Sequence, residues 1–136
     1  MDNPVVSVVM NSRNGARYIR SSVESVISQT YKHWELIFFD NNSTDETESV
    51  ISSYADSRIK YFKSNSTLSL GEARSAAWDL INGKYVAVLD SDDLWFPDKI
   101  TKQLQLIEKS GSAICISNTL FFSKKNKEVL YKRNPL

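Results

Sequence analysis

Five apolar runs recur along the chain, and each is short and bounded by polar or turn-forming residues. They cover Val5–Met10, Trp34–Phe39, Arg58–Phe62, Lys84–Leu89 and Ser112–Ser117. Runs of this length and composition are typical of buried β-strands, because helices generally extend over about ten residues or more. The pattern therefore predicts five strands.

The stretches around these runs place apolar residues three and four positions apart, which is the spacing of one helix face. The apolar positions of the four predicted helices are Ile19, Val23, Val26 and Ile27; Val50, Ile51 and Tyr54; Ala73, Ala76, Ala77, Leu80 and Ile81; and Ile100, Leu104 and Ile107. Strands and helices are therefore predicted to alternate.

The ends of the predicted helices carry signals of their own. Ser43-Thr44-Asp45-Glu46 has the pattern of a capping box, which predicts the start of the second helix. Gly83 is placed to cap the C-terminus of the third helix. The fourth helix is predicted to begin close to Pro97 and to stop at Gly111.

Strands that alternate with helices predict the α/β class, with a mostly parallel sheet flanked by helices on both faces. Sheets of this kind bind ligands beyond the carboxyl ends of their strands. Three polar segments follow predicted strands here, namely Asn11–Asn14, Asp40–Ser43 and Asp90–Asp93. We therefore expect the functional site at the sheet edge where these segments lie.

Asp90-Ser91-Asp92 is the strongest chemical signal in the sequence, and it directly follows the apolar run Tyr85–Leu89. Side chains two positions apart on an extended chain point the same way, so these two carboxylates are predicted to converge. Convergent carboxylates repel one another unless a cation lies between them. Mg²⁺ takes oxygen ligands and is commonly shared with substrate phosphates. The spacing therefore predicts a metal–diphosphate site.

Composition narrows the class of protein. The chain has 136 residues, of which 41% are hydrophobic and 24% charged, and its net charge is +1. These values are typical of one soluble globular domain, and so small a net charge predicts no nucleic acid partner. No apolar stretch reaches the roughly 18 residues that a transmembrane helix needs. Because the N-terminus also lacks a signal-peptide pattern, we expect a cytoplasmic protein.

The last part of the chain reads differently. Cys115 lies in the apolar run Ala113–Ile116 and is expected to be a small buried hydrophobe. From about residue 118, two apolar stretches flank the charged segment Ser123–Glu128, which predicts a hairpin with a charged turn. An uncovered sheet edge near Asn118 would favour pairing with a second copy, so a homo-oligomer is a further expectation.

Five stretches taken together resemble glycosyltransferase family 2, whose members have the GT-A fold. They are Val6–Asn14, Ser25–Tyr31, Trp34–Asp45, Gly71–Arg74 and Val88–Lys99, in the family's order and spacing. The resemblance implies that residues 1–136 form a single GT-A-like nucleotide-sugar-binding domain, a Rossmann-like half of the fold that is truncated relative to the family. Residues 118–136 would then be a hairpin or an incomplete acceptor part.

The resemblance also implies an activity. Family members of this kind are inverting transferases that use a nucleotide-diphosphate sugar, commonly a UDP-sugar, in polysaccharide or glycoconjugate assembly. The family's DXD motif falls on Asp90 and Asp92, which would bind Mn²⁺ or Mg²⁺. The acceptor would be a glycan or a lipid-linked glycan, which would place the protein peripherally at the inner face of the membrane. The residues implied to contact the donor are Asn11, Arg13, Asn14, Asp40, Asn41, Arg74, Asp90 and Ser91.

The sequence departs from the family at the expected base-binding positions. Asn41 stands where the family usually has a second acid that contacts the uracil. Asn11 and Arg13 stand where the family has Thr or Pro and then an aromatic residue. Because an asparagine amide both donates and accepts hydrogen bonds, whereas a carboxylate only accepts, the nucleotide base is left open.

Inverting transfer also needs a general base that removes the proton of the acceptor hydroxyl. In the family this carboxylate lies well after the DXD motif. The only acidic side chain after Ser117 is Glu128, which lies in a lysine-rich turn. The base is therefore expected beyond residue 136, and a non-catalytic nucleotide-sugar-binding module remains the alternative.

Two other α/β classes fit less well. A phosphoacceptor signalling domain needs an acid pair after its first strand, where this chain has Asn11-Ser12-Arg13. A dinucleotide-dependent dehydrogenase needs a glycine-rich loop there, and only Gly15 occurs.

Overall fold

The computed structural model describes residues 5–122 and 127–129. The chain forms two compact units, Met1–Ile100 and Thr101–Leu136, and each is described by itself. Within the described residues, no helix combines the length and the hydropathy that crossing a bilayer requires.

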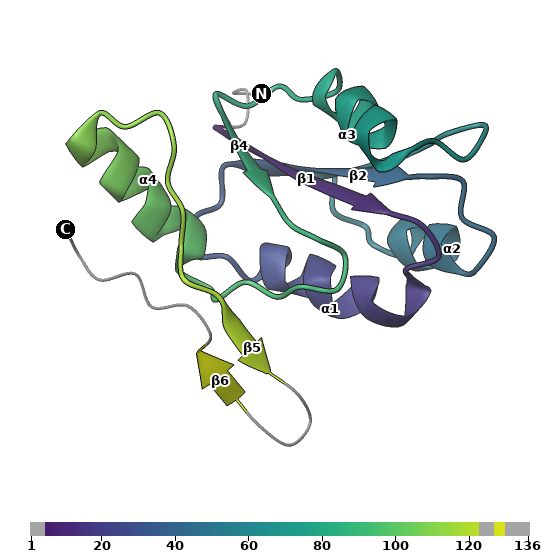
Figure 1. Cartoon of the computed structure of the whole chain (residues 1–136), viewed down its shortest axis with the longest axis horizontal. Coiled ribbons are helices and arrows are strands. Elements are labelled where there is room, and N and C mark those ends of the chain that lie inside the picture. The colour runs from purple at the N-terminus through teal and green to yellow at the C-terminus, as the bar shows by residue number, and fades with distance from the viewer. Residues whose placement is uncertain (1–4, 123–126, 130–136) are drawn as a thin grey trace. The chain divides into compact units, whose positions relative to one another are not determined.

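The first unit is built on a four-stranded parallel sheet (Figure 1). Its strands are β1 (Val6–Ser12), β2 (Trp34–Asp40), β3 (Ile59–Lys63) and β4 (Tyr85–Val88), in the order β3-β2-β1-β4. Four of the five predicted strands are thereby confirmed. The register places Ser12 beside Asp40, so β1 and β2 end level with one another.

Helices cover both faces of this sheet, as predicted for the α/β class. Helix α3 (Leu70–Trp78) lies on one face, and α1 (Ala16–Ile27) and α2 (Thr47–Ser52) lie on the other (Figure 1). The two central strands are buried almost throughout, which explains their nearly continuous apolar sequence. On the α3 face the helix packs on the sheet through a core cluster of Val9, Phe39, Ala73 and Ala77.

The start of α2 differs from the predicted capping box. The helix begins at Thr47, and Glu46 in the capping position makes no side-chain cap bond. Instead, Asp45 Oδ1 accepts hydrogen bonds from the Thr47 amide (3.0 Å) and hydroxyl (2.6 Å). Ser43 does not cap the helix, because its Oγ accepts a hydrogen bond from the Asn14 amide, 29 residues away, at 2.8 Å. A tertiary contact therefore outcompetes the local cap.

The ends of α3 also differ from expectation. The helix ends at Trp78, so Gly83 does not cap it. Gly83 serves a close approach instead, because a Cβ atom there would lie 2.5 Å from the Ser7 amide nitrogen. A complete capping box starts the same helix, formed by Ser69 and Glu72.

The second unit contains most of α4 (Lys99–Ser110) and a hairpin of β5 (Leu120–Phe122) and β6 (Lys127–Val129). Gly111 ends α4 with a φ of +65°, as predicted. The hairpin is confirmed for these two antiparallel strands, while its turn at 123–126 and the apolar residues 130–131 lie outside the described residues.

The strand predicted over Ser112–Ser117 is wrong. The described chain is irregular there, Ile114 is 79% exposed, and Cys115 is only partly buried. An apolar run becomes a strand only where a neighbouring strand satisfies its backbone hydrogen bonds. Among the described strands, none pairs with this segment.

Candidate functional site

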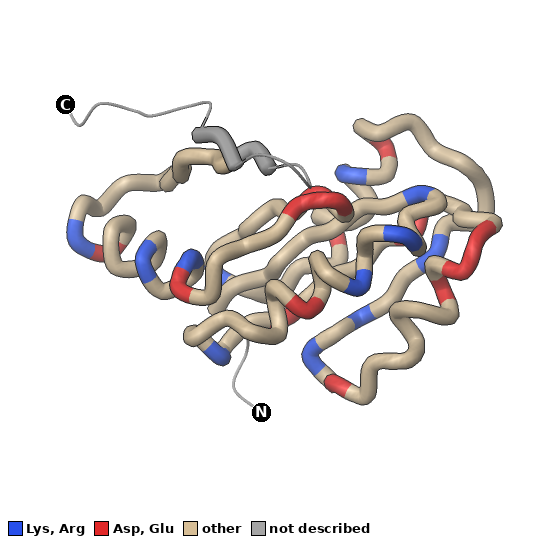
Figure 2. The backbone as a smooth tube through the Cα atoms, turned by 90° about the horizontal axis from the view of Figure 1, so that it is seen from below, with Lys and Arg blue, Asp and Glu red and all other residues tan. Residues whose placement is uncertain are grey.

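The carboxyl ends of three parallel strands meet at one edge of the sheet in the first unit. Ser12 and Asp40 end β1 and β2, and the Leu89 amide donates to Val9 O at 3.0 Å, which keeps the chain beyond β4 against β1. Asp90–Asp93 follows as a tight turn closed by the Asp93 amide, which donates to Asp90 O at 3.0 Å. We call this segment the acidic bend, and it forms one of the red stretches in Figure 2.

Helix α1 holds the acidic bend through side chains on one face. Ser22 and Ser25 lie three positions apart on α1, and Gln29 follows shortly after the helix ends at Ile27. Ser22 Oγ donates to Ser91 O at 2.8 Å, and buried Gln29 donates through Nε2 to Phe96 O at 2.8 Å. Ser25 Oγ accepts from a backbone amide of the same segment at 3.2 Å. Two polar residues of α1 and one just beyond its end therefore fix the path of the chain through and beyond the bend.

The bend concentrates negative charge beside a single cation. Asp90 and Asp92 are exposed, and Arg74 Nη2 on α3 lies 3.6 Å from Asp90 Oδ1. Desolvation, together with the charges of Asp92 and Asp90, raises the pKa of the Asp93 carboxyl. The exposed carboxylates thus create a local negative field that favours a bound cation.

The loop after β1 is tied to the loop after β2. Asn14 adopts a φ of +55°, its amide donates to Ser43 Oγ at 2.8 Å, and its Oδ1 accepts from the Thr44 amide at 2.8 Å. The side chain of Arg13 is exposed beside it. Asn14 therefore shapes the loop, while Arg13 is accessible to a ligand.

Asp40 lies at the end of β2 but is fully buried. Its Oδ1 accepts from the Ser43 amide at 2.8 Å and its Oδ2 from the Tyr61 hydroxyl at 2.6 Å. Burial and the hydrogen bond to the Asp40 carboxylate raise the pKa of Tyr61. Both carboxylate oxygens are therefore engaged within the protein.

Asn11 and Asn41, the other two polar residues at these strand ends, also bind protein groups. Asn11 Nδ2 donates to Ala73 O in α3 at 3.0 Å. Asn41 makes two bonds to the main chain of Leu68, donating to its carbonyl at 2.9 Å and accepting from its amide at 2.8 Å. Sequence reasoning predicted the position of these residues but not the direction of their side chains.

The predicted site residues thus separate into two groups. The structure brings Arg74 and Asp90 together and leaves Arg13 and Asp92 exposed at the strand ends. Asn11, Asn14, Asp40 and Asn41 are hydrogen-bonded within the protein. The contributions of Tyr61 and Leu68 were missed, and no local sequence signal marks them. The Ser69–Glu72 capping box beside them was also missed, although its spacing is a recognisable signal.

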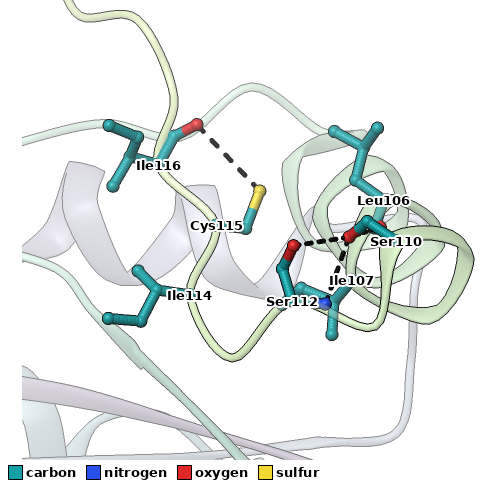
Figure 3. Close-up of a pocket in the computed structure, with 7 residues that line it drawn as sticks. All are labelled: Leu106, Ile107, Ser110, Ser112, Ile114, Cys115 and Ile116. Carbon is teal, nitrogen blue, oxygen red and sulfur yellow. Dashed lines mark hydrogen bonds between the residues drawn. The ribbon is translucent and has the colours of Figure 1, made fainter.

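The second unit contains a hollow of about 330 Å³ lined by Leu106, Ile107, Ser110, Ser112, Ile114, Cys115 and Ile116 (Figure 3). Its two serine side chains are bonded to one another at 2.8 Å. Apart from the thiol, the lining holds no ionisable side chain. This surface therefore offers little for catalysis, and the candidate site remains at the sheet edge.

A parallel sheet flanked by helices, with an acidic bend and an arginine at its carboxyl edge, is typical of α/β proteins that place a ligand site at that edge. The chain belongs to glycosyl transferase family 2, whose family model matches residues 7–135. The resemblance inferred from the sequence is thereby confirmed.

Two relatives illustrate the match. The chain is 35% identical over 118 residues to the UDP-Glc:alpha-D-GlcNAc-diphosphoundecaprenol beta-1,3-glucosyltransferase WfgD of Escherichia coli, covering 87% of this chain and 47% of the relative. It is 43% identical over 114 residues to the putative teichuronic acid biosynthesis glycosyltransferase TuaG of Bacillus subtilis, covering 81% of this chain and 44% of the relative. The chain thus spans about half the length of these curated relatives.

Solved structures agree on the fold. The chain superposes on S. aureus TarS 1-349 in complex with UDP with a TM-score of 0.73 and 23% identity, covering 76% of this chain and 32% of that one. It superposes on the mannosyltransferase PcManGT of Pyrobaculum calidifontis, in complex with GDP-Man and Mn²⁺, with a TM-score of 0.71 and 22% identity, covering 78% and 33%. The predicted GT-A fold is confirmed.

Proposed function

We propose that this chain is the donor-binding part of an inverting glycosyltransferase that takes a nucleotide-diphosphate sugar, with a UDP-sugar as the first candidate. The observation that supports it most directly is the placement of Arg74 against Asp90 at the carboxyl edge of the sheet, beside exposed Asp92. An arginine and a pair of exposed carboxylates are complementary to a metal-bound diphosphate.

The residues present fit a divalent metal. Asp90 and Asp92 offer hard oxygen ligands. Burial, followed by the charges of Asp92 and Asp90, raises the pKa of neighbouring Asp93. No group of three or more His, Cys, Asp or Glu side chains in the described part of the chain could enclose an ion. Two carboxylates with the remaining positions left to phosphate and water suit Mg²⁺ or Mn²⁺. When bound, such an ion would neutralise charge on the leaving nucleoside diphosphate.

The residues of the chain then take separate roles. Arg74 and Arg13 are assigned to the phosphates or the base, because a planar guanidinium can both form paired hydrogen bonds and stack. Asp92 and Asp90 would hold the metal, and Ser91 would lie beside the donor. Asn11, Asn14, Asp40 and Asn41, which are hydrogen-bonded within the protein, would hold the loops that carry these residues.

The donor site can be tested by calorimetric titration of UDP, GDP and dTDP with and without Mn²⁺. We expect metal-dependent binding of at least one nucleotide, weakened about tenfold or more by Asp92→Ala. Asp79→Ala is the matched control, because Asp79 is an exposed acid in the C-terminal cap position of α3. Absence of binding by the wild-type protein, or unchanged binding by Asp92→Ala, would overturn the proposal.

A second candidate is a module that binds the donor without transferring the sugar. Its support is that the chain after Ser117 carries only one acidic side chain, Glu128. Incubation of the protein with the preferred nucleotide-sugar and glycan acceptors separates the two candidates. Release of nucleoside diphosphate at a rate above the uncatalysed one would exclude the binding module.

The acceptor class is proposed from relatives. The name of the Escherichia coli relative specifies a diphosphoundecaprenol-linked acceptor. A glycan or lipid-linked glycan acceptor is therefore the class to test here, with the protein working in the cytoplasm at the inner face of the membrane. Self-association is also proposed.

A further inference from the structure

Asn41 holds the main chain of Leu68 as a neighbouring strand would. Its Nδ2 donates to Leu68 O at 2.9 Å, and its Oδ1 accepts from Leu68 N at 2.8 Å. The Leu68 side chain also packs against the core cluster. An asparagine amide can make both bonds, whereas an aspartate at this position could only accept and would face the Leu68 carbonyl.

The same strand ends hold this segment at two further points. The Ser64 amide donates to Asp40 O at 2.9 Å where the segment leaves β3. Asn11 Nδ2 donates to Ala73 O at 3.0 Å in the first turns of α3. Residues 64–73 are therefore fastened to the carboxyl ends of β1 and β2 at both ends and in the middle.

Arg74 directly follows the last of these fixed points. Ala73 is 1% exposed in the core cluster, so the backbone from which Arg74 projects is held firmly. The Arg74–Asp90 pair itself spans 3.6 Å between side chains that are 48% and 63% exposed. Exposed ion pairs are too weak to orient their partners. The backbone that carries Arg74 therefore decides which positions its guanidinium can reach.

We propose that Asn41 and Asn11 are positioning residues of the donor site, which fasten residues 64–73 so that Arg74 is presented to the acidic bend. This inference rests on the proposed function and assigns both asparagines to Arg74 rather than to the donor. The acidic bend is also held against β1, the strand that carries Asn11, because the Leu89 amide donates to Val9 O at 3.0 Å. Strand β1 thus sets the place of both Arg74 and Asp90.

A double-mutant cycle tests the proposal with Asn41→Asp, Arg74→Ala and the double variant. The readouts are the affinity for the preferred nucleotide with Mn²⁺ and the hydrogen exchange of the Leu68 amide. We expect Asn41→Asp to weaken nucleotide binding about tenfold and to speed Leu68 exchange. Because Asn41 acts through Arg74, the double variant should bind no more weakly than Arg74→Ala alone.

Asn65→Asp is the matched control, since it adds the same charge to an exposed asparagine of the same loop. It should leave both readouts unchanged. Asn11→Ala removes the hydrogen bond to Ala73 O without changing charge. It should weaken nucleotide binding in the wild-type background but not in Arg74→Ala. It also keeps the proposal testable if Asn41→Asp does not fold.

The outcomes separate the two proposals. If the wild-type protein binds nucleotide and the losses of affinity in Asn41→Asp and Arg74→Ala add up in the double variant, the positioning role is overturned. The proposed donor site would not be affected by that result. Equal losses in Asn65→Asp and Asn41→Asp would also overturn it, because charge alone would then explain the effect. A wild-type protein that binds no nucleotide would overturn the proposed function and this inference with it.

Discussion

Two buried carboxylates, Glu35 and Asp40, lie near the two ends of β2, and both accept hydrogen bonds from their neighbours. At the amino end, Glu35 accepts hydrogen bonds from Ser7 Oγ at 2.6 Å, Lys60 Nζ at 2.6 Å and the Asn82 amide at 2.7 Å. Burial alone would raise the pKa of Glu35, but these hydrogen bonds lower it on balance. A buried carboxylate with this many donors is stabilising only in its charged form.

Replacing Glu35 by Gln should therefore alter both stability and its pH dependence. We expect a loss of about 1–3 kcal/mol in the free energy of unfolding at neutral pH. Because the folded-state pKa of Glu35 lies below its ordinary value of 4.5, its contribution is present above that value and is lost as the pH falls through the folded-state pKa. The difference in free energy of unfolding between wild type and variant, measured with urea, should therefore stay constant down to about pH 5 and narrow as the pH falls below 4.5.

Glu48→Gln is the control for this prediction, because Glu48 pairs with Lys63 at 2.8 Å on the exposed surface. Exposed ion pairs contribute little to the free energy of unfolding. The free energy of unfolding of this variant should therefore follow that of the wild type closely as the pH falls. A constant gap between wild type and Glu35→Gln over the same pH range would contradict the assigned role of the carboxylate.

Two glycines show how differently the helices and turns of the first unit depend on backbone freedom. At Gly83, before β4, a Cβ atom would lie 2.5 Å from Ser7 N, whereas nothing lies within 4 Å of one built at Gly71 in α3. The Gly83 amide also donates to Ser7 Oγ at 2.8 Å. The path from α3 into β4 therefore requires a residue without a side chain, and the first turn of α3 does not.

We expect Gly83→Ala to lower the free energy of unfolding by about 1–3 kcal/mol, since β1 would have to shift. Gly71→Ala should raise it by as much as about 0.5–1 kcal/mol, because alanine loses less entropy in a helix than glycine. Both values follow from denaturant titrations of the two variants. A harmless Gly83→Ala would mean that the contact between this turn and β1 is looser than described.

The structural features that the sequence predicted have local causes, and those that it did not predict depend on long-range contacts. β1 and β2 were predictable because buried parallel strands must be apolar along most of their length, and the partly buried edge strands β3 and β4 still carry short apolar runs. The run at Ser112–Ser117 has a similar composition, but composition does not report whether a strand partner exists. Ser43 matched a capping pattern, yet its Oγ accepts from the Asn14 amide, which is a contact between loops that no local rule anticipates.

For the molecule as a whole, topology predicted where the candidate site would lie. Parallel strands bring their carboxyl ends together, so the order of strands and helices predicted which polar segments would meet. The direction of each side chain did not follow, because Asn11 and Asn41 could equally have faced a ligand. Their bonds to Ala73 and Leu68 depend on how α3 packs on the sheet, which the sequence pattern does not specify.

The surface of the second unit gives a prediction about assembly. Ile114 is 79% exposed, Ile116 65% and Leu106 57%, and all three line its apolar hollow. Grouped exposed apolar side chains favour association, because contact with a second copy removes them from water. We therefore expect the protein to self-associate. The double variant Ile114→Ser/Ile116→Ser should shift it towards the monomer, as measured by sedimentation velocity over a concentration series. Leu70→Ser, at a 60% exposed position of α3, should not cause this shift. A wild-type protein that stays monomeric at every concentration would contradict the prediction.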